Sequence, residues 1–266
     1  MRVDVLQIGY GDDETVDERR DRVVALVRER RGADLVVLPE LWPHGGFAYR
    51  TWADRAEPVD GPTAAALADA AREIGAVVHA GSVIERDGEH LYNTSLLLGP
   101  DGARLATYRK IHRFGFGVGE PKLLEAGEDL VTVRVPVPVS DPDGGGVVVG
   151  LATCYDLRFP EMFRALLDAG AEVVLVPAAW PAARVHHWTL LSRARAIEDQ
   201  VVVVACNTAG THAGHEMGGR SLVVGPTGDV LAEAGTDEQV LSVDVDATQV
   251  AAVRERFPVL ADRRLG

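Results

Sequence analysis

Two cysteines occur in this chain, and their surroundings differ. Cys206 ends the apolar run Val-Val-Val-Val-Ala-Cys, which is typical of a buried thiol that serves as a small hydrophobe. Cys154 follows the apolar segment 147–152 and precedes a helical pattern, so it is expected at a turn from strand to helix. Such a turn lifts a side chain to the sheet edge and directs free backbone N–H groups and the helix dipole toward it. These features would lower the thiol pKa below about 8.5 and stabilise an oxyanion, so Cys154 is the candidate nucleophile.

A thiol nucleophile needs a base, and histidine is the usual partner. None of the eight histidines is singled out by its neighbours. His186 and His187 are adjacent and would point to different faces. His212 and His215 lie in a glycine-rich loop, where such a pair is weak support for a metal site. A Cys–His pair stays open at this point.

The carboxylate of Glu40 is a better candidate for the base. Glu40 follows Leu-Val-Val-Leu-Pro and precedes Leu-Trp, and a carboxylate in such apolar surroundings is costly unless it is paired. A desolvated glutamate with a raised pKa could accept the proton of a thiol. Lys110 follows a predicted strand and is either an ordinary surface lysine or a cation that supports an oxyanion and positions Glu40.

The bulk composition excludes several classes of function. With 40 acidic and 27 basic residues, the chain has a formal net charge of -13, which repels phosphate backbones and anionic lipid. We therefore expect no nucleic-acid or membrane partner. No apolar run approaches the roughly 20 residues of a membrane helix, and the first residues lack a signal-peptide pattern. The cysteines show neither disulfide-framework nor metal-ligand spacing. We expect a cytoplasmic protein.

Short apolar runs alternate with amphipathic segments along the chain, the pattern of a layered α/β fold. Thr15 and Glu18 predict a capping box at the start of a helix over 15–31. The other elements expected are strands at 3–8, 35–38, 147–152, 173–176 and 201–206, a hairpin formed by 77–84 and 91–98, helices at 62–74, 160–169, 185–199 and 248–256, and a turn at 141–146.

Two further features concern the architecture. Segment 109–129 is rich in glycine and has little periodicity, and such long irregular segments in compact domains are more often functional than not. Segment 33–42 aligns without gaps on segment 171–180, and each contains a Pro and a Trp at the same places. The repeat indicates two similar α/β halves, packed together. Because no stretch resembles a linker, residues 1–266 are expected to form one domain.

The sequence resembles the nitrilase superfamily, the carbon–nitrogen hydrolases, over nearly its whole length. The resemblance is carried by three blocks in the family's order, and it extends to Tyr92-Asn-Thr-Ser95, His187-Trp188 and the segment 193–200. The three blocks are Leu38-Pro-Glu40, Tyr108-Arg-Lys110-Ile-His112 and Cys154-Tyr-Asp-Leu-Arg-Phe-Pro-Glu161.

The resemblance implies a role for each block. Glu40 would be the general base, Cys154 the nucleophile, and Lys110 a stabiliser of the tetrahedral oxyanion together with the backbone N–H of Tyr155. A second glutamate of the family corresponds to Glu120, which would orient Lys110 or the substrate amide, with Glu125 and Glu128 as alternatives. Asn93 and Glu161 would support the site structurally. Trp180 and His187 would line the pocket.

The resemblance also implies a fold and an activity. The fold would be the four-layer αββα sandwich of the nitrilase type, paired through a helical face into a homodimer or part of a higher homo-oligomer. The activity would be hydrolysis of a small-molecule amide through a thioester, without metal or organic cofactor. The alternatives are an N-carbamoyl-amine amidohydrolase that uses the same triad, and a non-catalytic partner-binding protein.

The block after Cys154 resembles the Nit and ω-amidase branch, whose substrates are small dicarboxylate monoamides or deaminated peptides. Arg158 would then bind a substrate carboxylate, with Arg113 as another candidate. Alternatively, Arg158 forms a structural ion pair with Asp156, Glu161 or another nearby carboxylate. The loop 113–120 departs from the usual ω-amidase segment, so the identity of the substrate stays open.

Overall fold

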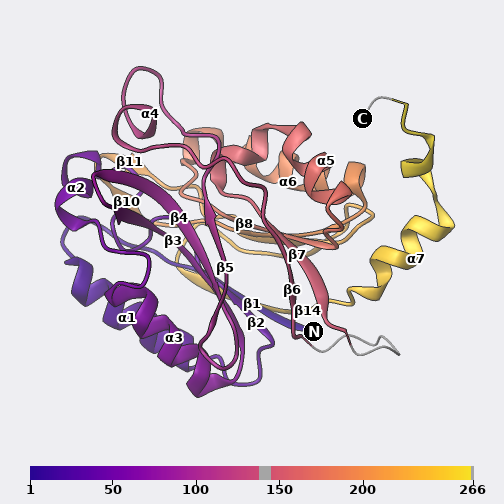
Figure 1. Cartoon of the computed structure of the whole chain (residues 1–266), viewed down its shortest axis with the longest axis horizontal. Coiled ribbons are helices and arrows are strands. Elements are labelled where there is room, and N and C mark those ends of the chain that lie inside the picture. Colours follow the sequence, from indigo (N-terminus) through magenta and orange to yellow (C-terminus); the bar gives the residue numbers. More distant parts are fainter. Residues whose placement is uncertain (138–144, 265–266) are drawn as a thin grey trace.

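The computed structural model describes residues 1–137 and 145–264. The turn expected at 141–146 therefore lies largely outside the described residues. Four layers follow one another in space: helices α1 and α3, a first sheet, a second sheet, and helices α5 and α6 (Figure 1). This is the αββα arrangement expected from the sequence.

Each of these two sheets has six strands within the described residues, and β10 pairs with β11 in a separate two-stranded sheet. The order in the first is β14-β1-β2-β3-β4-β5, and in the second it is β13-β12-β9-β8-β7-β6. The first sheet contains β1 (Arg2–Gln7), β2 (Leu35–Val37), β3 (Val77–Asp87), β4 (His90–Leu98), β5 (Arg104–Arg109) and β14 (Gln239–Asp244). The second contains β6 (Thr132–Val135), β7 (Val147–Leu151), β8 (Val173–Pro177), β9 (Val202–Cys206), β12 (Leu222–Val224) and β13 (Val230–Glu233).

The two sheets have the same internal pattern, which confirms the repeat seen in the sequence. In each, three central strands run parallel and the outer ones are antiparallel to their neighbours. Strands β2 and β8, which contain the two copies of the repeat, occupy equivalent central places. Because parallel strands end at the same edge, the residues after β2 and β8 are brought to one edge of each sheet.

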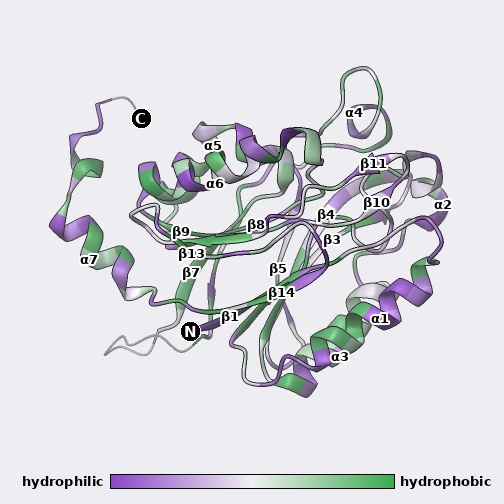
Figure 2. Cartoon of the chain, turned by 180° about the vertical axis from the view of Figure 1, so that it is seen from behind, coloured by the Kyte–Doolittle hydropathy of each residue, from purple (hydrophilic) through white to green (hydrophobic). Residues whose placement is uncertain are grey.

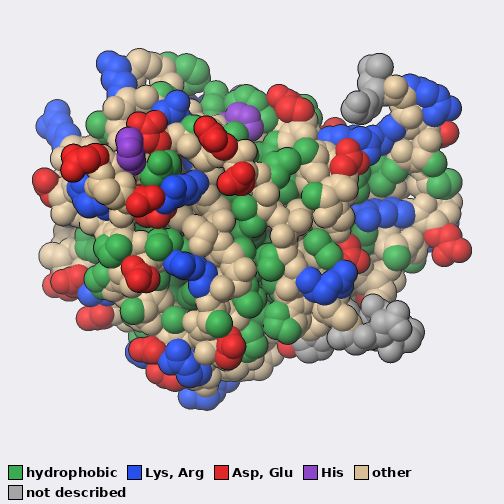
Figure 3. Space-filling model, in the orientation of Figure 1, with side chains coloured by type: hydrophobic (Ala, Val, Ile, Leu, Met, Phe, Trp, Pro, Cys, Tyr) green, Lys and Arg blue, Asp and Glu red, His purple; other side chains and the backbone are tan. Residues whose placement is uncertain are grey.

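Alternate residues of the central strands face different layers, as the period of two requires. Leu35 and Val37 of β2 belong to the core cluster shared with the second sheet, whereas Val36 packs toward α1 and α3. The strands are accordingly apolar along most of their length, while the helices alternate between apolar and polar faces (Figure 2). On the surface, charged side chains of both signs surround hydrophobic ones over β5 and β6 (Figure 3).

The long helices lie close to their predicted bounds: α1 (Val16–Arg28), α3 (Pro62–Ile74), α5 (Pro160–Asp168), α6 (Val185–Asp199) and α7 (Thr248–Arg256). Thr15 and Glu18 form the predicted capping box of α1. The short elements are α2 (Trp52–Arg55), α4 (Glu120–Leu123), β10 (Thr211–His212), β11 (His215–Glu216) and the 3-10 helices η1 (Tyr49–Thr51), η2 (Cys154–Arg158), η3 (Ala182–Arg184) and η4 (Val259–Asp262). In the described part of the chain, no helix has the length and apolar character needed to cross a membrane.

Candidate active site

Glu40 lies just beyond the end of β2, in a tightly constrained turn. The next residue, Leu41, has a positive φ of 47°, which is uncommon for a residue with a branched side chain, and its N–H donates to Ser82 Oγ at 3.0 Å. A Cβ on Gly81 of β3 would lie 1.9 Å from the carbonyl oxygen of Pro39, so only glycine allows this approach. The turn thus fixes Glu40 at the sheet edge, where it is only 3% exposed.

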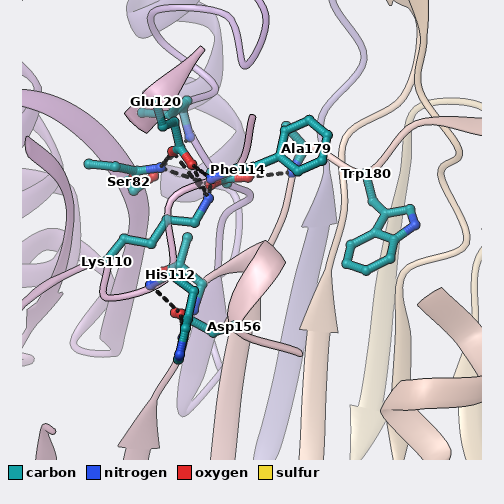
Figure 4. A network of polar contacts seen from close by, with 12 residues as sticks. Ser82, Lys110, His112, Phe114, Glu120, Asp156, Ala179 and Trp180 are labelled. Atoms are coloured by element: carbon teal, nitrogen blue, oxygen red, sulfur yellow. Dashed lines mark hydrogen bonds and ion pairs between the residues drawn. The ribbon is translucent and has the colours of Figure 1, made fainter. Parts of the chain in front are cut away.

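Both oxygens of the Glu40 carboxylate accept hydrogen bonds. Oε1 accepts from Lys110 Nζ at 2.7 Å and from Asn93 Nδ2 at 2.8 Å. Oε2 accepts from the backbone N–H of Ala179 at 2.9 Å, just after β8 (Figure 4). The carboxylate is therefore paired with a cation, and both of its oxygens accept hydrogen bonds from protein donors, as burial of a charge requires.

Lys110 joins Glu40 to a second carboxylate. Its Nζ lies 2.9 Å from Glu120 Oε2 and 3.1 Å from Oε1, and Asn93 Nδ2 donates to Glu120 Oε1 at 2.7 Å. The backbone N–H of Phe114 also donates to Glu120, which closes the glycine-rich loop over the site. Glu120 is 3% exposed, whereas Glu125 and Glu128, the alternatives considered from the sequence, are exposed. Glu120 is thus the second glutamate in the network.

The charges in this buried network do not balance, since two carboxylates face one ammonium. Burial would lower the pKa of Lys110, but the charges of Glu120 and Glu40 outweigh it, and the pKa is raised well above its ordinary value. Burial raises the pKa of Glu120 despite the neighbouring Lys110. The two carboxylates therefore favour the charged form of Lys110.

Cys154 begins the five-residue helix η2 with a positive φ of 48°. Its sulfur lies in the same buried cluster as Glu40 and Lys110, and the residue is 8% exposed. The expected fall in thiol pKa is wrong for this state of the site: burial, followed by the charge of Glu40, raises the pKa of Cys154 well above its usual value. The sequence-based expectation counted the helix dipole but neither of these larger effects. A protonated thiol of this kind needs a base at the moment of attack.

Asp156 fixes this turn to the end of β5. Its Oδ2 accepts from Tyr108 Oη at 2.6 Å and from the Thr153 N–H at 2.8 Å, while Oδ1 contacts His112 through the backbone N–H at 3.0 Å and Nδ1 at 2.8 Å. Asp156 is fully buried, and the His112 ring stacks on Phe159. Tyr108 and His112 flank Lys110 in sequence, so one aspartate positions both the turn that contains Cys154 and the strand end that leads to Lys110.

A narrow pocket of about 20 Å³ leads to Cys154. The residues that line it are Phe47, Phe114, Cys154, Tyr155, Arg158, Ala179, Trp180, Pro181 and Arg184. The N–H of Tyr155 belongs to the first turn of η2, where backbone donors have no intrahelical acceptor. No histidine lines this pocket in the described part of the chain, so the structure does not support a Cys–His pair.

Arg158 forms no structural ion pair with any described carboxylate. Asp156 is occupied by Tyr108 and His112, and Glu161 is exposed in the first turn of α5 without contact to the site. Instead, the Arg158 guanidinium lies over the Trp180 ring at 4.6 Å, and its Nη2 is 3.3 Å from His187 Nδ1. The ion-pair alternative is therefore wrong for Asp156 and Glu161.

Two other sequence-based candidates lie away from the pocket wall. His187 contacts Arg158 through Nδ1 and is not among the lining residues. Arg113, the other candidate for binding a carboxylate, donates to the carbonyl oxygen of Leu124 at 2.7 Å and so supports the irregular loop. Of the residues expected to bind a carboxylate or line the pocket, Arg158 and Trp180 do line it.

A larger cavity of about 570 Å³ lies beside β4 and β5. Two of its charged side chains, Arg109 and Glu85, already pair with each other, and Arg109 also pairs with Asp87 and covers the Tyr92 ring at 3.9 Å. No thiol lines it. The narrow pocket at Cys154 is therefore the candidate active site.

The sequence model of the carbon-nitrogen hydrolase family matches residues 2–255. The chain belongs to this family. The 2-oxoglutaramate amidase of Paenarthrobacter nicotinovorans is 41% identical to this hydrolase over 99% of the chain and 90% of the relative. The omega-amidase NIT2 of Homo sapiens is 35% identical over 91% of the chain and 88% of the relative.

Solved structures agree with the family assignment. A CN-hydrolase superfamily protein from Xanthomonas campestris, described with an arsenic adduct in its active site, has a TM-score of 0.89, with 32% identity over 100% of this hydrolase and 98% of that chain. An amidase from Nesterenkonia sp., described with acrylamide added to its active-site cysteine, has a TM-score of 0.79 and 29% identity over 98% and 99% of the two chains.

The sequence did not single out several residues of the hydrolase's pocket. Phe47 and Phe114 come from separate irregular segments and meet only in the folded chain, with ring centroids 6.3 Å apart. Arg184 lies in a stretch with no chemical motif. One available signal was that Arg184 lies in the short connection that follows Trp180, the last residue of the second copy of the repeat.

Proposed function

We propose that this chain is a cysteine-dependent amidase that hydrolyses the amide of a small, carboxylate-bearing molecule to a carboxylic acid and ammonia. The relatives named amidases support the reaction class. The observation that carries the proposal is the buried network in which Lys110 lies 2.7 Å from Glu40, beside the only thiol that faces a pocket in the described residues.

In the first half-reaction, Glu40 takes the thiol proton as the Cys154 sulfur attacks the amide carbon. The carbonyl oxygen becomes an oxyanion, stabilised by the Lys110 ammonium and the Tyr155 N–H. When the carbon–nitrogen bond breaks, Glu40 returns the proton to the leaving nitrogen, so ammonia departs and a thioester remains. Because burial and the charge of Glu40 raise the pKa of the thiol, we expect proton removal to accompany attack rather than precede it.

In the second half-reaction, Glu40 takes a proton from a water molecule as its oxygen attacks the thioester carbon. A second oxyanion forms at the same donors and collapses by breaking the carbon–sulfur bond. The sulfur recovers the proton from Glu40, and the carboxylic acid leaves. Glu120 accepts hydrogen bonds from Lys110 and Asn93 throughout and acts by positioning them.

The substrate class follows from Arg158. Its guanidinium lines the thiol pocket and contacts no described carboxylate, so it is available to bind the carboxylate of a substrate. Monoamides of dicarboxylic acids have this charge at one end and the scissile amide at the other. The name of the 2-oxoglutaramate amidase relative agrees with this class.

A homodimer is the second part of the proposal. Leu190 and Ile197 are 65% and 50% exposed, and their spacing places both on the outer face of α6, beside Val230 of β13. Two copies could bury this face against each other by twofold symmetry. Light scattering should give twice the chain mass, and Leu190→Glu with Ile197→Glu should give a monomer. A monomeric wild type would contradict this part.

The experiment that tests the activity is ammonia release from a panel of amides, with the two cysteines compared. Cys154→Ala should abolish turnover, whereas Cys206→Ala, which removes a fully buried thiol from the core, should retain it. Full activity of Cys154→Ala would refute the proposal. The N-carbamoyl-amine alternative would be supported by a different result: release of carbon dioxide and ammonia from an N-carbamoyl amine, with no ammonia released from simple amides.

A further inference from the structure

The thiol pocket contains a second guanidinium, that of Arg184, which the proposed chemistry does not use. Arg184 lines the pocket together with Arg158, and its Cζ lies 5.5 Å from the centre of the Phe114 ring. It forms no ion pair with any described carboxylate and donates no side-chain hydrogen bond to a described residue. Two arginines without carboxylate partners thus face one small space.

This arrangement is costly without a ligand. Burial, followed by the charge of Arg184, lowers the pKa of Arg158. The chain has a net charge of -13, so acidic side chains that could pair with an arginine are plentiful. Arg158 and Arg184 nevertheless pair with none of the described ones. Like charges held together in a partly buried site repel each other unless an anion lies between them.

The local structure keeps Arg184 at an unfavourable place. It precedes α6, whose first turn contains no acidic residue, so a cation lies at the positive end of a 15-residue helix. The indole N–H of Trp180 donates to the carbonyl oxygen of Arg184 at 2.8 Å, and the face of the same ring supports Arg158. One tryptophan therefore positions both arginines, through its edge and its face.

We propose that Arg158 and Arg184 form a carboxylate clamp, in which Arg184 is the specificity-determining residue that binds the substrate's carboxylate from the side opposite Arg158. A carboxylate has two oxygens and can accept from two guanidiniums at once. The inference rests on the proposed function, because it assumes that the clamp binds the far end of the molecule whose amide meets Cys154.

The clamp also explains the loop over the site. Phe114 lies under the Arg184 guanidinium, and the backbone N–H of Phe114 donates to Glu120. A bound carboxylate would draw the Arg184 guanidinium toward Arg158 at the mouth of the pocket. The Phe114 ring would then contact the apolar middle of the substrate. The clamp would thus bind the substrate's carboxylate at the mouth of the pocket, while the amide lies at Cys154. The distance between these two places would set the length of the substrate.

The test compares two amides of the same length: glutaramate, which ends in a carboxylate, and pentanamide, which ends in a methyl group. In Arg184→Gln, KM for glutaramate should rise about 10- to 100-fold, the effect of losing one charge-assisted contact, with kcat little changed. Activity on pentanamide should be unaffected. Arg184→Lys should restore part of the preference, and Arg28→Gln, which removes an exposed arginine on α1, should leave both substrates unchanged.

Binding of glutarate to the Cys154→Ala variant gives a readout without turnover. Its affinity should fall by a similar factor when Arg184→Gln is added. Equal losses on glutaramate and pentanamide, or an unchanged preference in Arg184→Gln, would overturn the clamp. A wild type that shows no preference for glutaramate over pentanamide would instead refute the proposed substrate class, so the two failures are distinguishable. If Arg184→Gln does not fold, Arg184→Lys decides: an unchanged preference and unchanged glutarate affinity would overturn the clamp.

Discussion

The carboxylate of Glu40 is bound by a backbone N–H from the opposite half of the molecule: Oε2 accepts from Ala179 at 2.9 Å, 139 residues later in the chain. The two residues follow β2 and β8, the equivalent strands of the two sheets. The internal repeat therefore has a consequence for the proposed chemistry, since one copy contains the proposed base and the other contains a donor that orients it. The second copy ends at Trp180, and the connection after it contains Arg184. Both residues line the pocket.

Replacing Glu40 by Gln should remove the base while keeping most of the packing. We expect kcat to fall by about 10²- to 10⁴-fold, the usual contribution of a positioned general base. Steady-state ammonia release provides the measurement. Glu125→Gln, at an exposed glutamate of the same loop region, should match the wild type. A Glu40→Gln enzyme within tenfold of wild-type kcat would contradict the role of Glu40 as the base.

The same variant should change the reactivity of the thiol in the opposite direction. Because burial and then the charge of Glu40 raise the pKa of Cys154, removing that charge should lower it. The rate of iodoacetamide alkylation at Cys154, followed by peptide mass spectrometry, should therefore reach its midpoint at a lower pH in Glu40→Gln than in the wild type. Cys206→Ala should not move the midpoint. An unchanged or higher midpoint in Glu40→Gln would show that its carboxylate is not charged beside the thiol.

Lys110→Met should destabilise the protein as well as inactivate it. Without the ammonium, the Glu40 and Glu120 carboxylates face each other in a buried site, and we expect a loss of about 3–5 kcal/mol in the free energy of unfolding. Activity should fall at least about 10²-fold, since an oxyanion donor is lost. Urea denaturation and turnover measure the two effects.

A second substitution separates stability from catalysis at this position. Lys110→Met combined with Glu120→Gln leaves one carboxylate, so it should recover much of the stability but no activity. Stability that does not improve in the double variant would mean that repulsion between the carboxylates is not the cause.

Asp156→Asn should weaken the turn that presents Cys154. The buried carboxylate accepts from Tyr108, Thr153 and His112, and an amide would direct N–H groups at some of these donors. We expect a loss of about 2–3 kcal/mol in unfolding free energy and a fall in kcat larger than the change in KM. Asp168→Asn, at an exposed aspartate paired with Arg263, is the matched control and should be nearly neutral. Unchanged kcat in Asp156→Asn would argue against the positioning role.

The sequence predicted the layers, and it brought forward Glu40, Lys110 and Cys154 as candidate site residues, because both depend on local signals. The buried strands are marked by their apolar runs, and Glu40, Lys110 and Cys154 lie within short blocks that resemble the family. The repeat also predicted the equivalence of β2 and β8. These features need no knowledge of which distant segments meet.

Contacts between distant segments could not be predicted in the same way. Glu120 differs from Glu125 and Glu128 only because the loop places its carboxylate against Lys110 and Asn93. The partner of Asp156 proved to be His112 rather than Arg158, since the end of β5 packs against η2. The direction of the thiol pKa was wrong for the same reason: burial and the charge of Glu40 are tertiary effects.

The most direct test of the central claim is intact-protein mass spectrometry after rapid acid quench during turnover of glutaramate. Formation of the thioester adds the acyl group and loses ammonia, so the adduct should have the mass of the protein plus glutaramate minus ammonia, and peptide mapping should place it on Cys154. The adduct should be absent from Cys154→Ala and present in Cys206→Ala. Turnover at the wild-type rate with an adduct on another residue, or with no adduct on Cys154 at any quench time, would contradict Cys154 as the nucleophile.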